Sequence, residues 1–319
     1  MAGAGPATAF AGMTCSAASC SFLIHASWIT QYSIEKMRAI HDVPAPAKLN
    51  LFLHVTGRRA DGYHLLQSAF ALIDWCDTLH FERRADGVLT REDLGCALPP
   101  DDLILRAARA LQQASGCRDG AHIGVVKRIP AQAGMGGGSS DAASTLLALN
   151  RLWGLGLNRA QLAGIGLPLG ADVPFFLHGG HGWVEGVGEQ VQALTLPAAR
   201  FVVVKPPQGL ETAAIFAAPD LRRDAEPATI VSFAANPYGF GRNDLQPVAG
   251  RLCPQVAQGL ELLARQGLAG RMTGSGSAVF AQVPQAVDDI GLQAPPGWQV
   301  RLCSSLDAHP LGGWVVGNG

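Results

Sequence analysis

Apolar and polar residues alternate along residues 47–56, which read AKLNLFLHVT. The apolar positions recur at every second residue, at Leu49, Leu51, Leu53 and Val55. The positions between them are Lys48, Asn50, Phe52, His54 and Thr56. A period of two predicts a β-strand, so Lys48 and Asn50 are expected side by side on one surface. Because Phe52 falls on the same face, we expect that face to be partly covered.

Similar patterns predict the other elements. Strands are predicted at 63–75, 78–83, 122–128, 183–194, 200–205, 271–283 and 298–304. Helices are predicted at 102–115, 140–153, 158–166, 211–218 and 247–266, with Asp101 as the N-cap of the first. Strands and helices are interleaved without a regular strand–helix–strand repeat. The pattern therefore favours the α+β class.

The chain of 319 residues is long enough for two domains. We place them at residues 37–185 and 186–319. Residues 1–36 are rich in Ala, Ser, Gly and Thr, and Glu35 is their first charged residue. Neither a secretory nor a mitochondrial signal is recognisable there, so this composition predicts a poorly ordered extension. Met37 is an alternative start, because recognisable fold patterning begins just after it.

Composition narrows the classes of function. Hydrophobic residues make up 48% of the chain and charged residues 15%, which suits packed cores and not a disordered protein. The formal net charge of −1 gives no basic field for nucleic acid or an anionic membrane. Short basic pairs such as Lys127-Arg128 are interpreted as a solvated face or a local anion contact. No run of 18 apolar residues predicts a membrane span.

Seven scattered cysteines without a Cys-x-x-Cys pair are typical of reduced thiols, so we expect a cytoplasmic protein. His178 and His181 flank Gly179-Gly180, which favours a turn over a metal site. No metal ligands are identified in the sequence.

The densest signal for chemistry is residues 129–150, IPAQAGMGGGSSDAASTLLALN. Glycines that lead into a helix let backbone N–H groups converge on an anion, and the helix N-terminus adds its dipole. This predicts a phosphate-binding loop, against the alternative of a flexible connector. The loop is not a Walker A motif, because no Gly-Lys-Ser/Thr follows the glycines. It is not the dinucleotide-binding fingerprint either, because Ser139 stands where the third glycine is required. The protein-kinase motifs His-Arg-Asp and Asp-Phe-Gly are absent as well.

Four separated segments together carry a family resemblance. They are Pro46–Leu51 (PAKLNL), the loop from Pro130 to Ser140, Gly170-Ala171-Asp172-Val173-Pro174, and 271–278 (RMTGSGSA). Because all four segments occur together, the chain resembles the GHMP small-molecule kinases over about residues 44–311. The resemblance implies an N-terminal domain like ribosomal protein S5, a ferredoxin-like C-terminal domain, and an active site in the cleft between them.

One branch of that family is the most similar. The string AKLNLFLHVTGRRADGYH, and Phe175 after Pro174, resemble kinases that phosphorylate the 2-hydroxyl of a cytidine-diphosphate-linked methylerythritol in the non-mevalonate isoprenoid pathway. The implied cofactor is ATP with Mg²⁺, and the partner is this small molecule, with a monomer or homodimer expected. Alternatives are a GHMP kinase for homoserine or a mevalonate-type alcohol, and a nucleic-acid-binding module.

The resemblance assigns the chemistry to two residues. Asp172 would be the general base that accepts the proton of the attacking hydroxyl. The alternative from the residues alone is a helix or turn cap. Lys48 would keep Asp172 ionised and steady the developing negative charge, where the alternative is an exposed lysine. Asn50 would orient the substrate.

The resemblance also implies binding residues. ATP phosphates would lie on Pro130, Ala131, Gln132, Ala133, Gly134, Met135, Gly136, Gly137, Gly138, Ser139 and Ser140, and either serine would contact phosphate or Mg²⁺. Gly274 and Gly276 would support the phosphates from the C-terminal side. Asp141 is interpreted as an acid that complements the helix dipole. Residues 131–133 depart from the more glycine-rich start of many relatives, which leaves the contacts before Gly134 open.

A base site is implied by three further residues. Tyr63 and Phe216 would sandwich the cytosine, and His64 would bind its edge. The alternatives are core packing for the two rings and a hydrogen-bonded turn position for His64.

Overall fold

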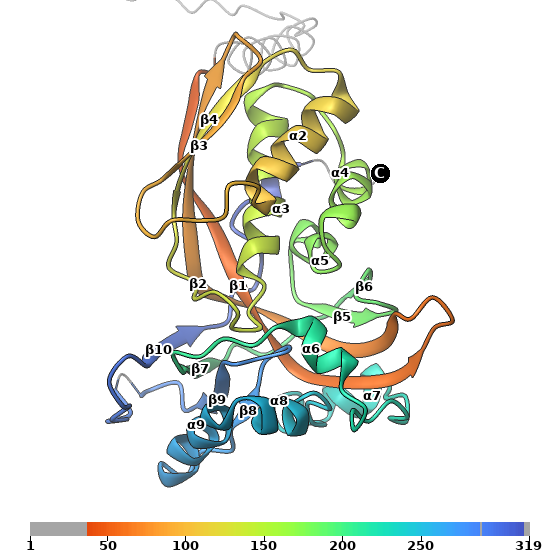
Figure 1. Ribbon diagram of the computed structural model, residues 1–319, viewed down its shortest axis with the longest axis vertical. Helices are drawn as coiled ribbons and strands as arrows, with labels where there is room; N and C mark the ends of the chain where they lie inside the picture. Colours follow the sequence, from red (N-terminus) through yellow and green to blue (C-terminus); the bar gives the residue numbers. More distant parts are fainter. Residues whose placement is uncertain (1–36, 288, 316–319) are drawn as a thin grey trace, which may run out of the picture. The chain divides into compact units, whose positions relative to one another are not determined.

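Two β-sheets, each with helices on one side, make up the chain in the computed structural model, which describes residues 37–287 and 289–315 (Figure 1). The predicted extension at 1–36 lies outside the described residues. The described residues from Arg38 onward belong to one compact unit. The domain division at residue 185 stays a prediction.

The first sheet has six strands. They are β1 (Ala39–Arg58), β2 (His64–Arg84), β3 (Leu89–Asp93), β4 (Gly120–Val126), β5 (Gly182–Glu185) and β6 (Gln190–Ala193). β1 and β2 form a long antiparallel hairpin. On its other edge β2 pairs with β5 through 68–70 and with β4 through 78–84, so the two predicted strands at 63–75 and 78–83 are one continuous strand. β3 pairs with β4 in parallel and β6 with β5 antiparallel.

The second sheet is antiparallel, in the order β10-β7-β9-β8. Its strands are β7 (Arg200–Lys205), β8 (Arg271–Met272), β9 (Val279–Val283) and β10 (Gln299–Ser304). The prediction of one strand over 271–283 was wrong for the middle of this range. Residues 273–278 leave the sheet as a loop in which Gly274 and Gly276 have positive φ, a conformation that glycine adopts without a steric penalty.

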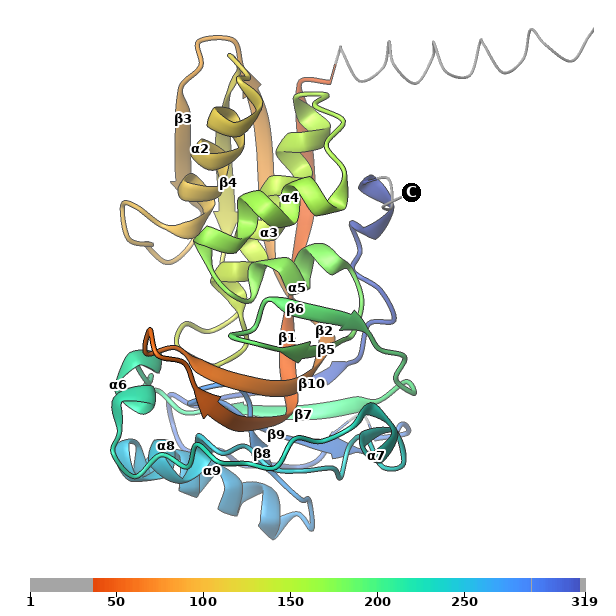
Figure 2. The same ribbon diagram turned by 90° about the vertical axis from the view of Figure 1, so that its right-hand side faces the viewer.

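Helices cover both sheets (Figure 1; Figure 2). On the first lie α2 (Leu103–Ser115), α3 (Gly137–Leu152) and α5 (Val173–His178), and α4 (Arg159–Gly166) packs on these three helices. The others are α6 (Thr212–Ala217), α7 (Ile230–Ala234), α8 (Gln246–Leu252) and α9 (Pro254–Arg265), with short 3₁₀ turns at Leu167–Leu169 and Gly312–Trp314. α9 packs on β8 and β9. In the described ranges, none of these helices combines the length and apolar character needed to cross a membrane.

Helix ends follow local chemistry. The N-cap of α2 is Asp102, one residue after the predicted Asp101, and its carboxylate accepts the N–H of Leu105 at 3.1 Å. Gly116 ends α2 in the left-handed conformation. The helix predicted at 247–266 is two helices, because Pro254 has no N–H to donate and keeps Cys253 out of the helical region.

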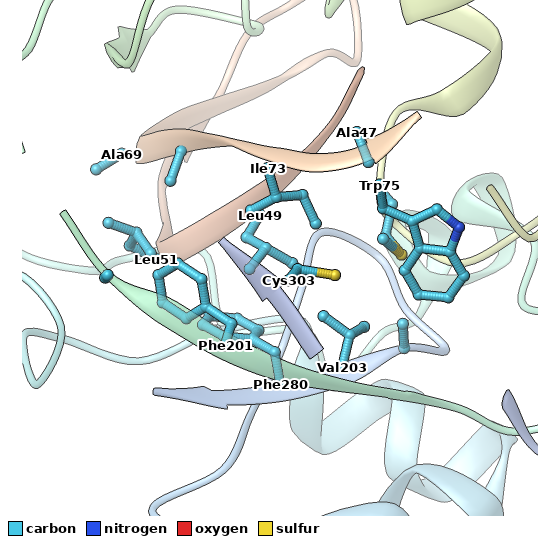
Figure 3. Packing of buried hydrophobic residues seen from close by; sticks show 14 of the residues in the cluster. Ala47, Leu49, Leu51, Ala69, Ile73, Trp75, Phe201, Val203, Phe280 and Cys303 are labelled. Atoms are coloured by element: carbon cyan, nitrogen blue, oxygen red, sulfur yellow. The ribbon is translucent and has the colours of Figure 1, made fainter. Parts of the chain in front are cut away.

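An apolar core joins the two sheets (Figure 3). Leu49 and Ile73 from the first sheet pack with Phe201, Val203 and Phe280 from the second. Because β1 belongs to this core, its position relative to the second sheet is fixed by packing. The same strand carries Lys48 and Asn50 to the edge of the core.

A shift in the pairing of β1 with β2 between Asn50 and Phe52 breaks the predicted alternation. Such a bulge inserts one extra residue and turns the following side chains to the opposite face. Phe52 therefore joins the core of Leu49 and Leu51, whereas Leu53 and Val55 pack in a second core with α8 and α9. The expectation that Phe52 shares a face with Lys48 and Asn50 was wrong.

Candidate active site

A cleft of about 830 Å³ lies where the two sheets meet. Its walls come from β1, β2, the glycine loop before α3, the start of α5, α6, and the loop between β8 and β9. Residues 101–104, Lys48, Asp172 and Phe216 also line it. Segments far apart in the sequence therefore share one cavity large enough for a small ligand.

Lys48 and Asp172 form an ion pair in this cleft. The Lys48 ammonium lies 3.7 Å from the Asp172 carboxylate, donates a hydrogen bond to the Asn50 side chain, and sits 4.6 Å from the centre of the Phe70 ring. Lys48 is buried, whereas 30% of the Asp172 side chain is exposed. Burial lowers the pKa of Lys48, and the Asp172 charge acts in the opposite direction. Lys48 is thus a buried lysine whose ammonium is held by Asp172 and Asn50, and not an exposed strand lysine.

Asp172 stands at the N-cap position of α5 but does not cap it. Its backbone is helical, with φ −80° and ψ −14°, and its side chain makes no capping hydrogen bond. The alternative of a helix cap is therefore not supported by the geometry. Because the carboxylate is not used by the helix, it remains available to a group in the cleft.

Asn50 ties three elements together. Its backbone N–H donates to the Thr273 hydroxyl at 2.9 Å, and its side-chain amide donates to Ser68 at 3.0 Å. The Thr273 hydroxyl also lies 3.2 Å from the carbonyl oxygen of Gly134. Ser68 and Thr273 were missed in the sequence, because nothing in the local pattern of either residue signals a contact with β1.

The two glycine loops touch through their backbones. A Cβ on Gly134 would lie 2.1 Å from the Thr273 oxygen, and one on Gly274 would lie 2.6 Å from the Gly134 oxygen. Both glycines have positive φ, +71° and +52°. Any larger residue would therefore separate the loops and strain the backbone.

The departure at residues 131–133 has a structural counterpart. The carbonyl oxygens of Gln132 and Ala133 accept the N–H groups of Ser277 and Ala278 at 3.1 and 3.3 Å. These carbonyls are therefore used to hold the two glycine loops together.

The N-terminus of α3 opens into the cleft. The helix begins at Gly137, three residues before the predicted start, and Gly136 precedes it with φ +72°. A Cβ on Gly136 would lie 3.0 Å from the Phe176 ring and 3.3 Å from Lys48 Cε. Ser139 lines the cleft, whereas Ser140 is buried and its N–H bonds to the Gly136 oxygen. Of the two serines, only Ser139 is therefore exposed to the cleft.

Lys127 lies between two carboxylates, one from β2 and one from α3. Its ammonium donates to both Asp77 and Asp141, and Asp77 also accepts the N–H groups of Arg128 and Ile129 at 2.5 and 2.8 Å. The interpretation of Lys127 as part of a solvated face was therefore wrong, and its local anion contacts are these two carboxylates. Burial raises the pKa of Asp141 to about 8, against the opposing charge of Lys127. Asp141 is thus a member of a buried cluster, and not only an acid near a helix dipole.

The residues of the predicted base site lie near the turn of the β1–β2 hairpin. The His64 and Phe216 rings stack with centres 4.9 Å apart and an interplanar angle of 29°, so α6 lies beside β2 (Figure 2). Tyr63 is 64% exposed, which removes core packing as its explanation. Phe216 lines the cleft, but Tyr63 and His64 do not. The structure thus pairs His64 with Phe216 and leaves Tyr63 in solvent.

Two family models match this chain. The GHMP kinases N terminal domain matches residues 102–180, and the GHMP kinases C terminal domain matches residues 221–294. The first covers the glycine loop and Asp172, and the second covers the loop that carries Gly274 and Gly276.

Known proteins narrow the family further. The 4-diphosphocytidyl-2-C-methyl-D-erythritol kinase of Albidiferax ferrireducens is 66% identical over 88% of this chain and 97% of its own length. A crystal structure of 4-(cytidine 5'-diphospho)-2C-methyl-D-erythritol kinase aligns with a TM-score of 0.70 at 33% identity, over 82% of this chain and 98% of the other. Homoserine kinase from Cytophaga hutchinsonii shares the fold, with a TM-score of 0.64 at 15% identity over 86% and 96% of the two chains. The predicted resemblance is confirmed: this chain belongs to the 4-diphosphocytidyl-2-C-methyl-D-erythritol kinase family of the GHMP kinases.

Proposed function

We propose that this chain transfers the γ-phosphoryl group of ATP to the 2-hydroxyl of 4-diphosphocytidyl-2-C-methyl-D-erythritol, in the non-mevalonate route to isoprenoid precursors. The observation that carries the proposal is the Lys48–Asp172 pair, which lies in one cleft with the glycine loops. Relatives named for this activity supply the identity of the alcohol.

Asp172 is the proposed general base. As the substrate hydroxyl attacks the γ-phosphorus, its O–H proton passes to the Asp172 carboxylate and the bond from the γ-phosphorus to the bridging oxygen breaks, releasing ADP. Lys48 lies 3.7 Å from that carboxylate, where its positive charge steadies the negative charge that develops during transfer. Asn50, bonded to Lys48, Ser68 and Thr273, holds the ammonium in place and orients the alcohol.

The ATP phosphates are assigned to the loop at 130–139 and the first turn of α3. Gly134 and Gly136 line the cleft, and α3 begins directly after them, so the positive end of its dipole suits an anion there. Gly274 and Gly276 line the same cleft from the C-terminal side.

Mg²⁺ is proposed as part of bound ATP, where it offsets phosphate charge. Ser139 lines the cleft, and its hydroxyl is a suitable oxygen ligand. Among the described residues no cluster of three acidic, His or Cys side chains offers a separate metal site. Mg²⁺ commonly takes most of its ligands from water and phosphate oxygens, so one hydroxyl from the protein is sufficient.

The cytidine is assigned to Tyr63, His64 and Phe216. Phe216 lines the cleft and stacks on His64, and the exposed Tyr63 is available to cover a base from another side. The described cysteines are all free thiols, which suits the proposed cytoplasmic location. A monomer or homodimer remains the expected assembly.

A phosphotransfer assay with γ-labelled ATP and three alcohols tests the assignment. We expect label on the cytidyl diphosphate alcohol at kcat/KM far above that for homoserine or mevalonate. Equal or faster labelling of homoserine or mevalonate would reassign the enzyme within the GHMP kinases, whose fold these alternatives share.

A further inference from the structure

Arg223, in the loop between α6 and α7, contacts His64 across 159 positions of sequence. Its Nε donates a hydrogen bond to His64 Nε2 at 2.9 Å. The rest of the guanidinium is held by backbone carbonyls: Nη1 donates to Leu221 at 2.8 Å, and Nη2 donates to Phe216 and Ala218 at 3.1 and 2.8 Å. Arg223 is therefore held in place around the end of α6, close to both stacked rings.

This contact decides where the imidazole proton lies. A guanidinium has donors only, so the ring nitrogen that faces it must be an acceptor. His64 Nε2 then carries a lone pair, and in a neutral ring the proton sits on Nδ1. Burial and the charges of Arg223 and Arg58 lower the pKa of His64, which keeps the ring neutral near pH 7.

The opposite edge of the ring is available to a ligand. Within the described part of the chain, no hydrogen bond engages His64 Nδ1. The edge of His64 that Arg223 leaves open is thus a donor edge. A ligand that meets it must present an acceptor, because a facing N–H would leave two donors unpaired.

We propose that Arg223 is a positioning residue that fixes His64 in the Nδ1–H tautomer and so makes the base site select cytosine over uracil. Cytosine presents a bare N3 that accepts this hydrogen bond, whereas uracil presents N3–H to the same donor. The inference rests on the proposed function, because it takes the base site to lie at Tyr63, His64 and Phe216. Arg223 does not touch the reacting atoms, and its effect is confined to the choice of base.

The tautomer is measured without any substrate. In ¹⁵N-histidine-labelled enzyme, two-bond ¹H–¹⁵N spectra distinguish a protonated Nδ1 from a protonated Nε2, and His64→Asn assigns the signal. We expect Nδ1–H in the wild type and in the control Arg222→Met, which removes a charge from an exposed neighbour paired only with Asp224 in the described structure. Arg223→Met should shift the ring toward Nε2–H. A wild-type spectrum with Nε2–H would overturn the proposal even if the variant failed to fold.

Selectivity gives the second readout. For the wild type and Arg222→Met we expect the uridine analogue of the substrate to have a KM about 10- to 100-fold above that of the cytidine substrate, as for one mismatched buried hydrogen bond. In Arg223→Met this ratio should fall toward one while the KM for ATP stays constant. An unchanged ratio would refute the selective role. If the wild type phosphorylates neither nucleotide alcohol, the proposed function fails, and the tautomer result still stands by itself.

Discussion

At the scale of single residues, Asp77 and Asp141 share the Lys127 ammonium but differ in their other contacts. Asp77 accepts two backbone N–H groups, whereas one Asp141 oxygen is buried without a hydrogen-bond partner. The pKa of Asp141 is about 8 in the folded chain, well above its ordinary value of 3.8, mainly because of burial. The folded state therefore holds a proton that the unfolded state has lost between these two pH values.

This difference predicts a pH dependence of stability. Because the folded chain binds more protons in this window, its free energy of unfolding should fall as the pH rises from about 4 to about 8. Asp141→Asn, a neutral isostere, should flatten that slope and be more stable than wild type at pH 9 by roughly 1–3 kcal/mol. Urea unfolding at pH 6 and pH 9 measures both. Asp77→Asn is the contrasting variant and should be less stable at each pH. An Asp141→Asn slope equal to the wild-type slope would contradict the account.

Tyr63 and Phe216 carry the prediction on substrate choice. If their rings hold a cytosine, Tyr63→Ala or Phe216→Ala should each raise the KM for the cytidyl alcohol by roughly 5- to 150-fold, since stacking is worth ~1–3 kcal/mol per base. The KM for ATP should stay constant, because the glycine loops lie on other segments. Steady-state kinetics with each substrate varied in turn gives both values. A parallel rise in both KM values would assign the rings to structure and place the base elsewhere.

At the scale of elements, the site depends on the backbone contact between the loop that contains Gly134 and the loop that contains Gly274. Gly134 and Gly267 both have φ +71°, but a Cβ on Gly267 meets nothing within 4 Å, whereas one on Gly134 meets the Thr273 oxygen at 2.1 Å. Gly267→Ala should therefore cost only the backbone strain of about 1–2 kcal/mol. Gly134→Ala should cost more and raise the KM for ATP. Thermal unfolding and ATP kinetics compare the pair, and equal behaviour of the two variants would show that the loop contact does not matter.

The elements that the sequence predicted well have local causes. α2 ends at a glycine in the left-handed conformation, and β7 was predicted with its observed bounds. The missed features depend on distant contacts. The bulge in β1 follows from its pairing with β2, and the bonds from Asn50 to Thr273 cross 223 positions. Lys127 looked like an exposed charge, because its partner Asp77 lies 50 residues away.

At the scale of the whole described chain, the cleft exists because one core joins both sheets (Figure 3). β1 supplies Lys48, the segment before α5 supplies Asp172, and the loop between β8 and β9 supplies Gly274. The strand pattern predicted that Lys48 and Asn50 are neighbours. That Asp172 joins them followed only from the family resemblance, because a lone Asp near glycines fits a cap equally well.

The most direct test of this account is the rate of phosphoryl transfer in Asp172→Asn, measured in a single turnover with γ-labelled ATP and the cytidyl alcohol. The control is Asp220→Asn, which alters an exposed carboxylate paired with Arg251. We predict that Asp172→Asn binds ATP as the wild type does and transfers phosphate on the order of 10²–10⁴-fold more slowly, as expected for loss of a general base. A folded Asp172→Asn enzyme with a transfer rate close to that of wild type and Asp220→Asn would contradict the assignment of Asp172 as the base.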